Sequence, residues 1–387
     1  MKKVFLTITI SLCIGFAAMA QDDVPNSPNG GSQKMFVPGF AVTMYQYSNT
    51  PTPGVGNIST HNFTPVGIGA FPLIKLNDRL FLDCEVGFSA NSDGSTSTGI
   101  GELVGFYHIN SFMTAFFGNF SPHYGVYLGI LDDFTNRFGT GVSPIGMGHA
   151  LANQNGVGIQ GGLQCGYSKF TYQLYVANGP QLVIDNTTIG AGNQTGMLDY
   201  GSFTDNNKNK SFGWHIGFLP FSNSCLELTF SGEEVPKAGP IGSPIENINA
   251  TSMAFGLNYY HTFSPLMVRV IGEYDMVKVT NYDYPNMDTT TNGFYSFNNK
   301  QNGWFAGLTL RLPGSESNFI KNLELAGRLG AYNPPKDAPW GGDPTNQTTV
   351  TLTYWLTWAI PLSFEYDVLT TSSVKTQYFS TVLFFRF

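Results

Sequence analysis

The chain has 387 residues and a formal net charge of -7, and it combines 45 glycines and 14% aromatic residues with only 12% charged side chains. Charged residues make up about a quarter of an ordinary soluble domain. This composition therefore argues against a soluble globular protein.

The first twenty residues have the pattern of a cleavable secretory signal. Two lysines precede an apolar stretch that ends in an A-x-A cleavage site at 18–20. We expect a mature chain beginning at Gln21, with a short periplasmic segment over 21–34 and one folded domain over 35–387. Export leaves the periplasm, the cell surface or the outer membrane as the destination.

Apolar and polar residues alternate with a period of two through most of the chain, which is the strand pattern. In LFLDCEVGF (80–88), for example, Leu80, Leu82 and Cys84 fall on one face and Asp83 and Glu85 on the other. The alternating segments run to about ten residues, the length that crosses a bilayer as a tilted strand. No run of eighteen apolar residues follows the signal, so a membrane-spanning helix is not expected.

Short and long connections alternate between these segments. Short turns are predicted near 75–79, 110–111, 167–169, 220–224, 262–265, 313–321 and 361–362, and external segments at 48–61, 91–98, 121–156, 179–210, 232–249, 278–301, 333–347 and 372–376. Outer-membrane barrels have short periplasmic turns and long external loops. With 35–47 as the first strand, the sequence predicts an all-β fold: a single transmembrane antiparallel β-barrel of about 16 strands.

The last residues, TQYFSTVLFFRF (376–387), alternate up to the final aromatic residue. We expect this strand to pair with 35–47, because closing the sheet leaves no unpaired backbone groups in lipid. A terminal Phe387 preceded by Phe385 also resembles the signal by which the outer-membrane barrel assembly machinery recognises its substrates. These two residues are therefore predicted to form an assembly signal.

The third external connection, at about 121–156, is predicted to fold inward. A barrel of sixteen strands leaves an aqueous lumen, and the apolar residues of this loop suit the wall better than water. The candidate constriction residues are Asp132, Asp133, Arg137, His123 and His149. A salt bridge that only holds the loop in place is the alternative for the three charged residues.

Charged side chains on the polar faces of the strands are predicted to line the lumen. They are Asp83, Glu85, Glu102, Glu227, Arg269, Glu273, Asp275, Arg311, Glu324 and Arg328. Carboxylates outnumber guanidinium groups in this set, which favours a weakly cation-preferring or neutral pore. Solvated lining without a specific ligand is the simpler role for each of them.

The strand count and the long third loop resemble the trimeric diffusion porins of Gram-negative outer membranes. The segments 115–127 and 156–179 resemble the end of strand five and the strand-six/seven hairpin of the phosphate-selective porin O and P family. The resemblance implies a passive channel, trimeric and in contact with outer-membrane lipid, for small hydrophilic solutes. Anion selection needs a row of Arg or Lys along the passage, and this loop offers only Arg137, so phosphate transport is not favoured.

Two other functions stay open. A substrate-specific sugar channel is suggested by the aromatic residues Tyr124, Tyr127 and Phe134, and a plugged barrel acting as a surface scaffold by Asn-, Thr- and Gly-rich loops such as 187–210. The G-x-G-x-x-G match at 156–161 lacks the strand before it and the helix after it that a dinucleotide site requires. No enzymatic activity, cofactor, metal or nucleic-acid partner is expected.

Overall fold

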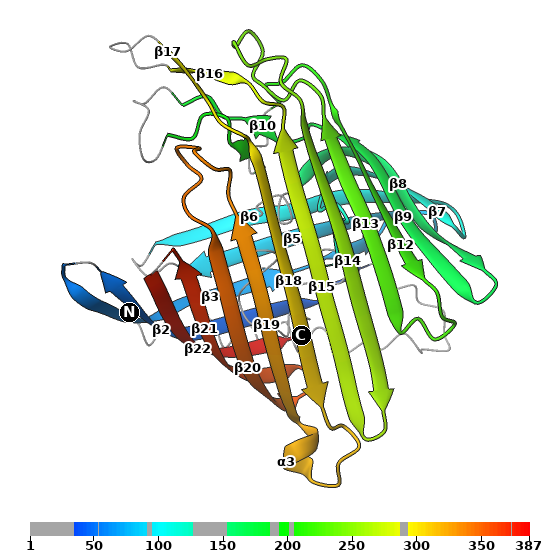
Figure 1. Cartoon of the computed structure of the whole chain (residues 1–387). Helices are drawn as coiled ribbons and strands as arrows, with labels where there is room; N and C mark the ends of the chain where they lie inside the picture. Colours follow the sequence, from blue (N-terminus) through cyan, green and yellow to red (C-terminus); the bar gives the residue numbers. More distant parts are fainter. Residues whose placement is uncertain are drawn as a thin grey trace.

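The structure is a computed structural model that describes residues 35–52, 54–90, 95–126, 153–185, 193–200, 205–286, 293–372 and 374–387. Within these ranges the chain forms one antiparallel sheet that closes on itself as a barrel of sixteen strands (Figure 1). No helix in this part of the chain is both long enough and apolar enough to cross a membrane. The predicted all-β barrel is confirmed.

The barrel strands follow one another around the wall in chain order. They are β2 (Gly39–Thr52), β3 (Gly56–Ala70), β5 (Leu80–Ala90), β6 (Thr96–Asn110), β7 (Met113–Phe120), β8 (Gln154–Cys165), β9 (Ser168–Ala177), β12 (Ser211–Leu219), β13 (Leu226–Val235), β14 (Ala250–Phe263), β15 (Leu266–Val279), β18 (Lys300–Arg311), β19 (Leu323–Asn333), β20 (Thr345–Thr357), β21 (Ile360–Thr371) and β22 (Val374–Arg386). Each pairs antiparallel with the next, and β22 pairs with β2.

The seam between the first and last strands closes as the sequence predicts. It runs in register from Phe40 opposite Arg386 to Asn49 opposite Gln377. At its lower end the Gly39 N–H donates to the Phe387 carbonyl (2.8 Å) and the Phe387 N–H donates to the Gly39 carbonyl (3.0 Å). The backbone at the end of the chain is therefore paired.

Two predicted boundaries at the start of the barrel are wrong. The external segment at 48–61 is strand, because β2 and β3 extend toward each other and are joined at 53–55. Their polar side chains pair across the strands, for example Ser48 with Thr60 at 2.6 Å between hydroxyl oxygens. The first strand accordingly begins at Gly39 rather than 35, and Met35–Phe36 forms a short strand, β1, beside β4 (Leu73–Lys75).

A third boundary error concerns the predicted turn at 361–362. The structure places the turn at 358–359, and β21 already begins at Ile360. Pro361 is the second residue of that strand, a position near a strand end where the missing N–H is tolerated. The proline therefore belongs to the strand rather than to the turn.

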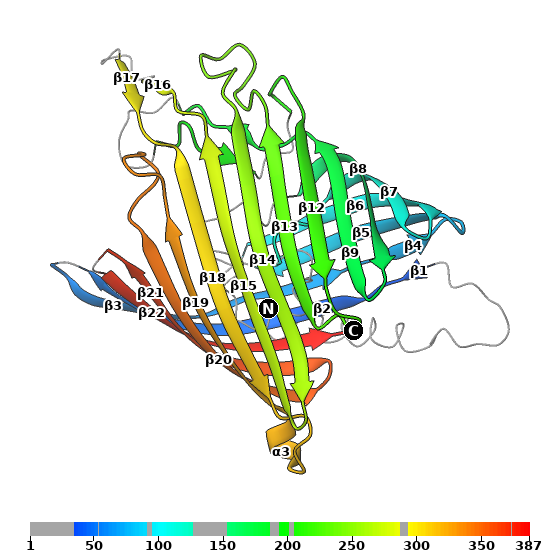
Figure 2. The ribbon, with the colours of Figure 1, turned by 45° about the vertical axis from the view of Figure 1, so that its right-hand side comes forward.

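The two ends of the barrel differ in their connections (Figure 2). At the turn end, short hairpins and a four-residue helix, α3 (Asn318–Lys321), join the strands. At the loop end lie the longer connections, which include β10 (Gln181–Leu182), β11 (Leu198–Asp199), β16 (Asp283–Asn286) and β17 (Gly293–Ser296).

The connections at the loop end have an apolar core of their own. Leu182, Ile245, Tyr284 and Phe297 are buried there together with the strand ends at Val277 and Val279. The sequence indicated polar external segments, but their scattered apolar residues pack on one another. This packing orders part of the loop end.

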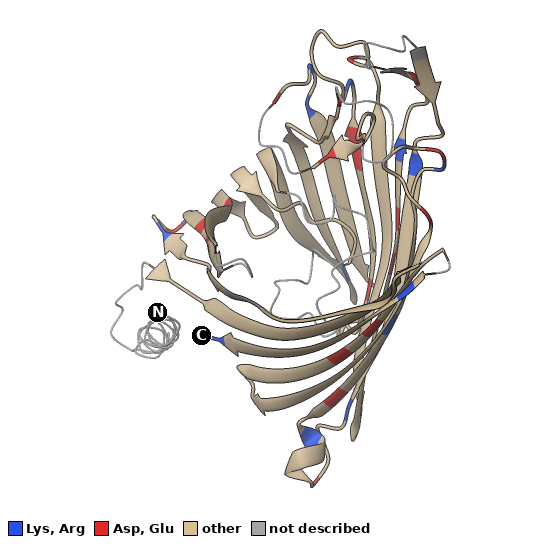
Figure 3. Cartoon of the chain, turned by 90° about the vertical axis from the view of Figure 1, so that its left-hand side faces the viewer, with Lys and Arg blue, Asp and Glu red and all other residues tan. Residues whose placement is uncertain are grey.

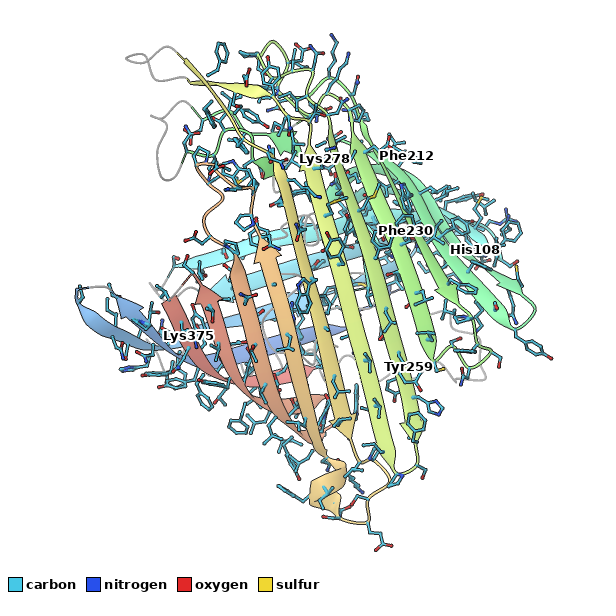
Figure 4. The ribbon with its side chains drawn as sticks, viewed as in Figure 1. His108, Phe212, Phe230, Tyr259, Lys278 and Lys375 are labelled. Atoms are coloured by element: carbon cyan, nitrogen blue, oxygen red, sulfur yellow. The ribbon has the colours of Figure 1, made fainter. Side chains whose placement is uncertain are left out.

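The outward face of the barrel is apolar and exposed. Phe230 lies on it between Phe212 and Lys278, toward the loop end, and Tyr259, toward the turn end (Figure 4). Phe212 is 46% exposed, and many other Leu, Ile, Val and Phe side chains on the outward face are exposed to a similar extent. An apolar belt of this kind suits contact with lipid.

Candidate functional site

Residues 121–126, which follow β7, cross the interior of the barrel. Backbone N–H groups of this short segment donate to side chains on four different wall strands. The bonds are Ser121 to Glu102 Oε1 of β6 (3.1 Å), His123 to Gln173 Oε1 of β9 (2.8 Å), Gly125 to Ser231 Oγ of β13 (3.0 Å) and Val126 to Glu273 Oε2 of β15 (2.5 Å). The predicted inward course of the third loop thus holds for these residues, while 127–152 lie outside the described part.

Two glycines permit the close contact between this crossing segment and the wall. Gly125 has φ +62°, a conformation that favours glycine, and a Cβ added there would lie 2.1 Å from Glu273 Oε2. On β14, a Cβ added to Gly256 would lie 1.9 Å from Val126 Cγ2. A side chain at either position would displace the segment.

Ser231 connects the crossing segment to two histidines. Its hydroxyl accepts the Gly125 N–H and is 2.9 Å from His215 Nδ1, and the His215 ring lies 5.8 Å from the His123 ring, edge to face. Burial lowers the pKa of His123 below its ordinary value of 6.5. Ser231 is fully buried and already hydrogen-bonded. Ser231, His215 and His123 therefore have the geometry of an anchor that holds the crossing segment to the wall.

The structure places the predicted wall charges on the inward face of the strands. Side chains on that face alternate with the exposed apolar ones, and cross-strand partners share it. On β15, Arg269, Glu273 and Asp275 all point inward and are at most 7% exposed. By the same alternation Asp83, Glu85, Glu102, Glu227, Arg311, Glu324 and Arg328 also face inward.

Of the predicted constriction residues, only His123 lies in the described part of the chain. Asp132, Asp133, Arg137 and His149 lie outside it. Their contribution to a constriction stays a prediction. The observed crossing is instead built from backbone amides and wall side chains.

Sequence reasoning missed three inward carboxylates, Glu233, Glu365 and Asp367. All three are at most 7% exposed. Asp367 accepts hydrogen bonds from Gln347 Nε2 (3.2 Å) and from the Thr349 hydroxyl. The period-two pattern of Glu365 and Asp367 was available in the strand predicted between the turn at 361–362 and the external segment at 372–376.

Charge is distributed unevenly along the barrel axis. Toward the turn end, the guanidinium carbons of Arg311 and Arg386 lie 5.5 and 5.3 Å from the centre of the Trp355 ring. Lys169, also near a turn, donates to Ser224 Oγ (2.9 Å). Figure 3 shows red segments along the strands and blue segments at both ends of the barrel, near α3 and the C-terminus and also at the loop end.

The inward face differs between two sectors of the wall. From β9 to β15 it is closely packed, with Gln173, His215 and Asp275 at most 3% exposed. From β2 to β6 it carries exposed polar side chains, such as Thr60 and Ser97. Water therefore reaches the second sector far more than the first.

Metal coordination finds no support in the described part of the chain. No three His, Cys, Asp or Glu side chains gather there in a way that would hold an ion. The site consists of a crossed lumen with a polar wall.

Comparison with solved structures supports the fold. The chain is similar to OmpF of Salmonella typhi, solved in complex with daunomycin (12% identity over 91% of this chain and 97% of that one, TM-score 0.58). It is also similar to DcaP, an outer membrane channel of Acinetobacter baumannii (13%, 91% and 97%, 0.57), and to an anion-selective porin of Comamonas acidovorans (11%, 91% and 99%, 0.55). No family model and no curated protein matches the sequence.

These likenesses cover almost the whole of each chain at very low identity. They show that the chain has the sixteen-stranded fold of Gram-negative outer-membrane porins. The phosphate-selective family is not shown by them. Substrate and ion preference must therefore be argued from the residues of this chain.

Proposed function

We propose that the protein is an outer-membrane channel through which small hydrophilic solutes or ions diffuse passively. The observation that carries this proposal is the polypeptide crossing the lumen at 121–126, held by wall side chains from β6 to β15. A barrel of this size without such a segment leaves a wide aqueous passage. The crossing narrows that passage and leaves the hydrated sector from β2 to β6 as the path.

The charge of the wall favours a weak preference for cations, or none. On the inward face of the described strands, carboxylates outnumber cationic side chains. The carboxylates are Asp83, Glu85, Glu102, Glu227, Glu233, Glu273, Asp275, Glu324, Glu365 and Asp367, and the cations are Lys169, Arg269, Arg311, Arg328 and Arg386. Among those that are not buried, Asp83, Glu85, Glu102 and Glu227 stand against Lys169, Arg311 and Arg386, a small excess of carboxylates. Rings of like charge select the opposite ion in pores.

Planar-bilayer recording tests the proposal. Purified protein is expected to insert with nanosiemens-scale conductance steps, and a salt gradient is expected to give a reversal potential at or slightly toward the cation value. A protein that inserts but never conducts would refute a channel. A strongly anionic reversal potential would refute only the assigned preference.

A plugged barrel that acts as a surface scaffold is the second candidate. The tight packing around the crossing favours it, because Tyr124 is 2% exposed and Asp275 0%. Deletion of the third loop separates the two: conductance should rise in a channel and change little in a scaffold. For a channel specific for sugar or phosphate, adding that solute should block the current.

We also propose that Phe387 and Phe385 serve the barrel assembly machinery. Phe385 is exposed on the outward face (38%), and the Phe387 backbone pairs with Gly39. Replacing Phe387 by Ala keeps that backbone pairing but removes the ring, so assembly rather than conductance should fall. Phe379→Ala, an outward ring on the same strand (41% exposed), is the matched control; equal membrane levels of both variants would contradict the proposal.

Association into trimers is a further part of the proposal. The outward face of β3 carries Phe63, which is 75% exposed, and the nearby strand β6 exposes Ile100 (59%). Such a surface suits another apolar surface as well as lipid. Native mass spectrometry in detergent would give the number of copies, and a purely monomeric species would contradict it.

A further inference from the structure

A cavity of about 820 Å³ lies at the loop end of the barrel, beside the β16–β17 hairpin at the top of Figures 1 and 2. Its volume is within the roughly 300–1,000 Å³ of small-molecule sites. It is separate from the crossing segment described above. The proposed passage of solutes through the lumen gives this cavity no role.

The β16–β17 hairpin presents two different faces. Tyr284 pairs with Tyr295 on one face, and both pack with Phe297, at ring distances of 4.9 and 5.8 Å. Asp283 and Ser296, paired on the opposite face, line the cavity together with Phe294. The alternation of the strands thus turns Tyr284 and Tyr295 into the loop-end core and Asp283, Phe294 and Ser296 toward the cavity, whose lining also includes Tyr282 and Phe297.

The buried face makes the hairpin a fixed platform. Asn299 Nδ2 donates to the Tyr284 hydroxyl and to the Gly196 carbonyl, both at 2.7 Å. The Tyr295 hydroxyl donates to the Thr195 carbonyl (3.1 Å), and burial raises the pKa of Tyr295 to about 12, so this donor stays protonated. A lining held in this way needs little reordering when a ligand binds.

The cavity lining combines an exposed aromatic ring with polar side chains. Phe294 is 73% exposed. The side chains of Asn281, Asp283, Asn298 and Asp337 add amide and carboxylate groups to the lining. Asp337 is also held at φ +65°, a conformation that non-glycine residues adopt rarely and often at functional positions.

We propose that this cavity binds a neutral saccharide at the outer mouth of the barrel. The apolar face of a sugar ring suits stacking on an exposed aromatic ring, and its hydroxyl groups both donate and accept. Amide side chains supply both donors and acceptors, and carboxylates accept strongly. No cationic side chain lines the cavity among the described residues, so an anionic solute is not its ligand.

An organic cation is the competing ligand, because two carboxylates are present. Asp283 and Asp337 are both exposed to solvent, where salt screens their charge. An aromatic cage for a cation encloses the charge between several rings, whereas here Phe294 alone of the lining rings is largely exposed. The geometry therefore favours a sugar ring stacked on one face of Phe294 over a cation enclosed by several rings.

Binding is tested on the full-length protein in amine-oxide detergent or in nanodiscs, since glucoside and maltoside detergents would compete. The probes are soluble neutral gluco-, galacto- and manno-oligosaccharides, with spermidine as the cationic probe, measured by calorimetry. At least one saccharide is expected to bind in the millimolar range or tighter. Its affinity should change little in about 0.5 M salt, where charges are screened within a few ångströms.

Variants locate the bound sugar. Phe294→Ala is expected to weaken binding about tenfold, which corresponds to about 1.4 kcal/mol, and Asn298→Ala should weaken it as well. The control is Phe221→Ala, which removes a half-exposed aromatic ring (50%) in a connection at the turn end. Absence of saccharide binding, unchanged affinity in Phe294→Ala, or salt-sensitive binding of spermidine alone would each overturn the assignment.

The cavity and the channel can be tested independently. The saccharide site rests on the cavity alone; only its use as a capture point for permeating sugar rests on the proposed function. A protein that binds sugar without conducting would keep the site and remove the channel. A protein that conducts normally without binding any saccharide would do the reverse.

Discussion

The wall from β9 to β15 and the wall from β2 to β6 differ in how their inward polar groups are used. In the first, Glu273 and His215 are 4% and 3% exposed, and they face the crossing segment at Val126 and His123. In the second, hydroxyl groups pair at the surface, as Ser89 does with Ser97 at 2.6 Å. The first sector holds most of the crossing segment, whereas the second, apart from Glu102 of β6, is more open to water.

This difference means that inward polarity is not by itself evidence of contact with solute. A buried carboxylate that accepts a backbone N–H is stabilised by that bond and cannot reach a passing ion. A carboxylate that is open to solvent does not hold the backbone and can interact with a passing ion. The acidic side chains of the lumen therefore divide into those that hold the crossing segment and those that act on permeating ions.

The largest effect is expected from filling the contact between the wall and the crossing segment. In Gly256→Val the new side chain would collide with Val126, and overpacking of this kind costs about 1–3 kcal/mol. The segment should leave the wall, and single-channel conductance should rise. Gly272→Ala on the neighbouring strand is the control, because its nearest atom, the Phe305 carbonyl oxygen, is 3.4 Å away; equal conductance in both variants would show that the segment does not narrow the path.

Removal of one anchor should have a smaller effect. Glu273→Ala leaves the buried Val126 N–H without its acceptor, at a cost of about 1–3 kcal/mol. Urea unfolding in lipid vesicles should show this loss, and current noise should increase. Glu273→Gln, which keeps an acceptor oxygen, should lie closer to the wild type; identical unfolding of both variants would argue against the anchor.

The fold was predictable from the sequence to a larger extent than the site. Period-two alternation and turn spacing predicted the barrel and its seam, because both depend on local pattern. The crossing contacts depend on pairs such as Gly125 with Ser231 and Val126 with Glu273, which are more than a hundred residues apart. Local periodicity places Glu273 on the inward face, but it cannot say that a backbone amide covers it.

Separation along the sequence also explains why the packing at the loop end was not predicted. Tyr284, Phe297 and Trp340 come from two different connections, and each is an isolated apolar residue in a polar segment. Nothing in one segment indicates that the other will pack against it. The cavity beside β16 and β17 follows from that packing and was therefore not predicted.

Ion selectivity should respond to the half-buried carboxylates of the second sector and not to the fully buried ones. Asp83→Asn together with Glu85→Gln removes two charges from the hydrated sector, so the reversal potential in a salt gradient should shift by several millivolts toward the anion value. Asp275→Asn changes a fully buried carboxyl group and should leave the reversal potential almost unchanged. Equal shifts of the reversal potential in both variants would show that carboxylates that hold the crossing segment and carboxylates that face the path do not differ in their effect on ions.

The smallest expected effect is the pH dependence of the crossing segment. Burial lowers the pKa of His123 in the folded protein below its value of 6.5 in the unfolded chain, so the unfolded chain binds the proton more tightly. The stabilising contribution of neutral His123 is therefore complete above pH 6.5 and is lost as the pH falls through the lower, folded value. Protonation would also place a charge beside His215.

Urea unfolding at about pH 8 and about pH 5, on either side of the ordinary histidine value, measures this effect. The wild type should lose more stability on acidification than His123→Gln, which has no group to protonate. His61→Gln is the control, because His61 lies on the exposed upper part of β3. If His61→Gln altered the pH dependence as much as His123→Gln, the effect would belong to histidines in general and not to the contact between the crossing segment and the wall.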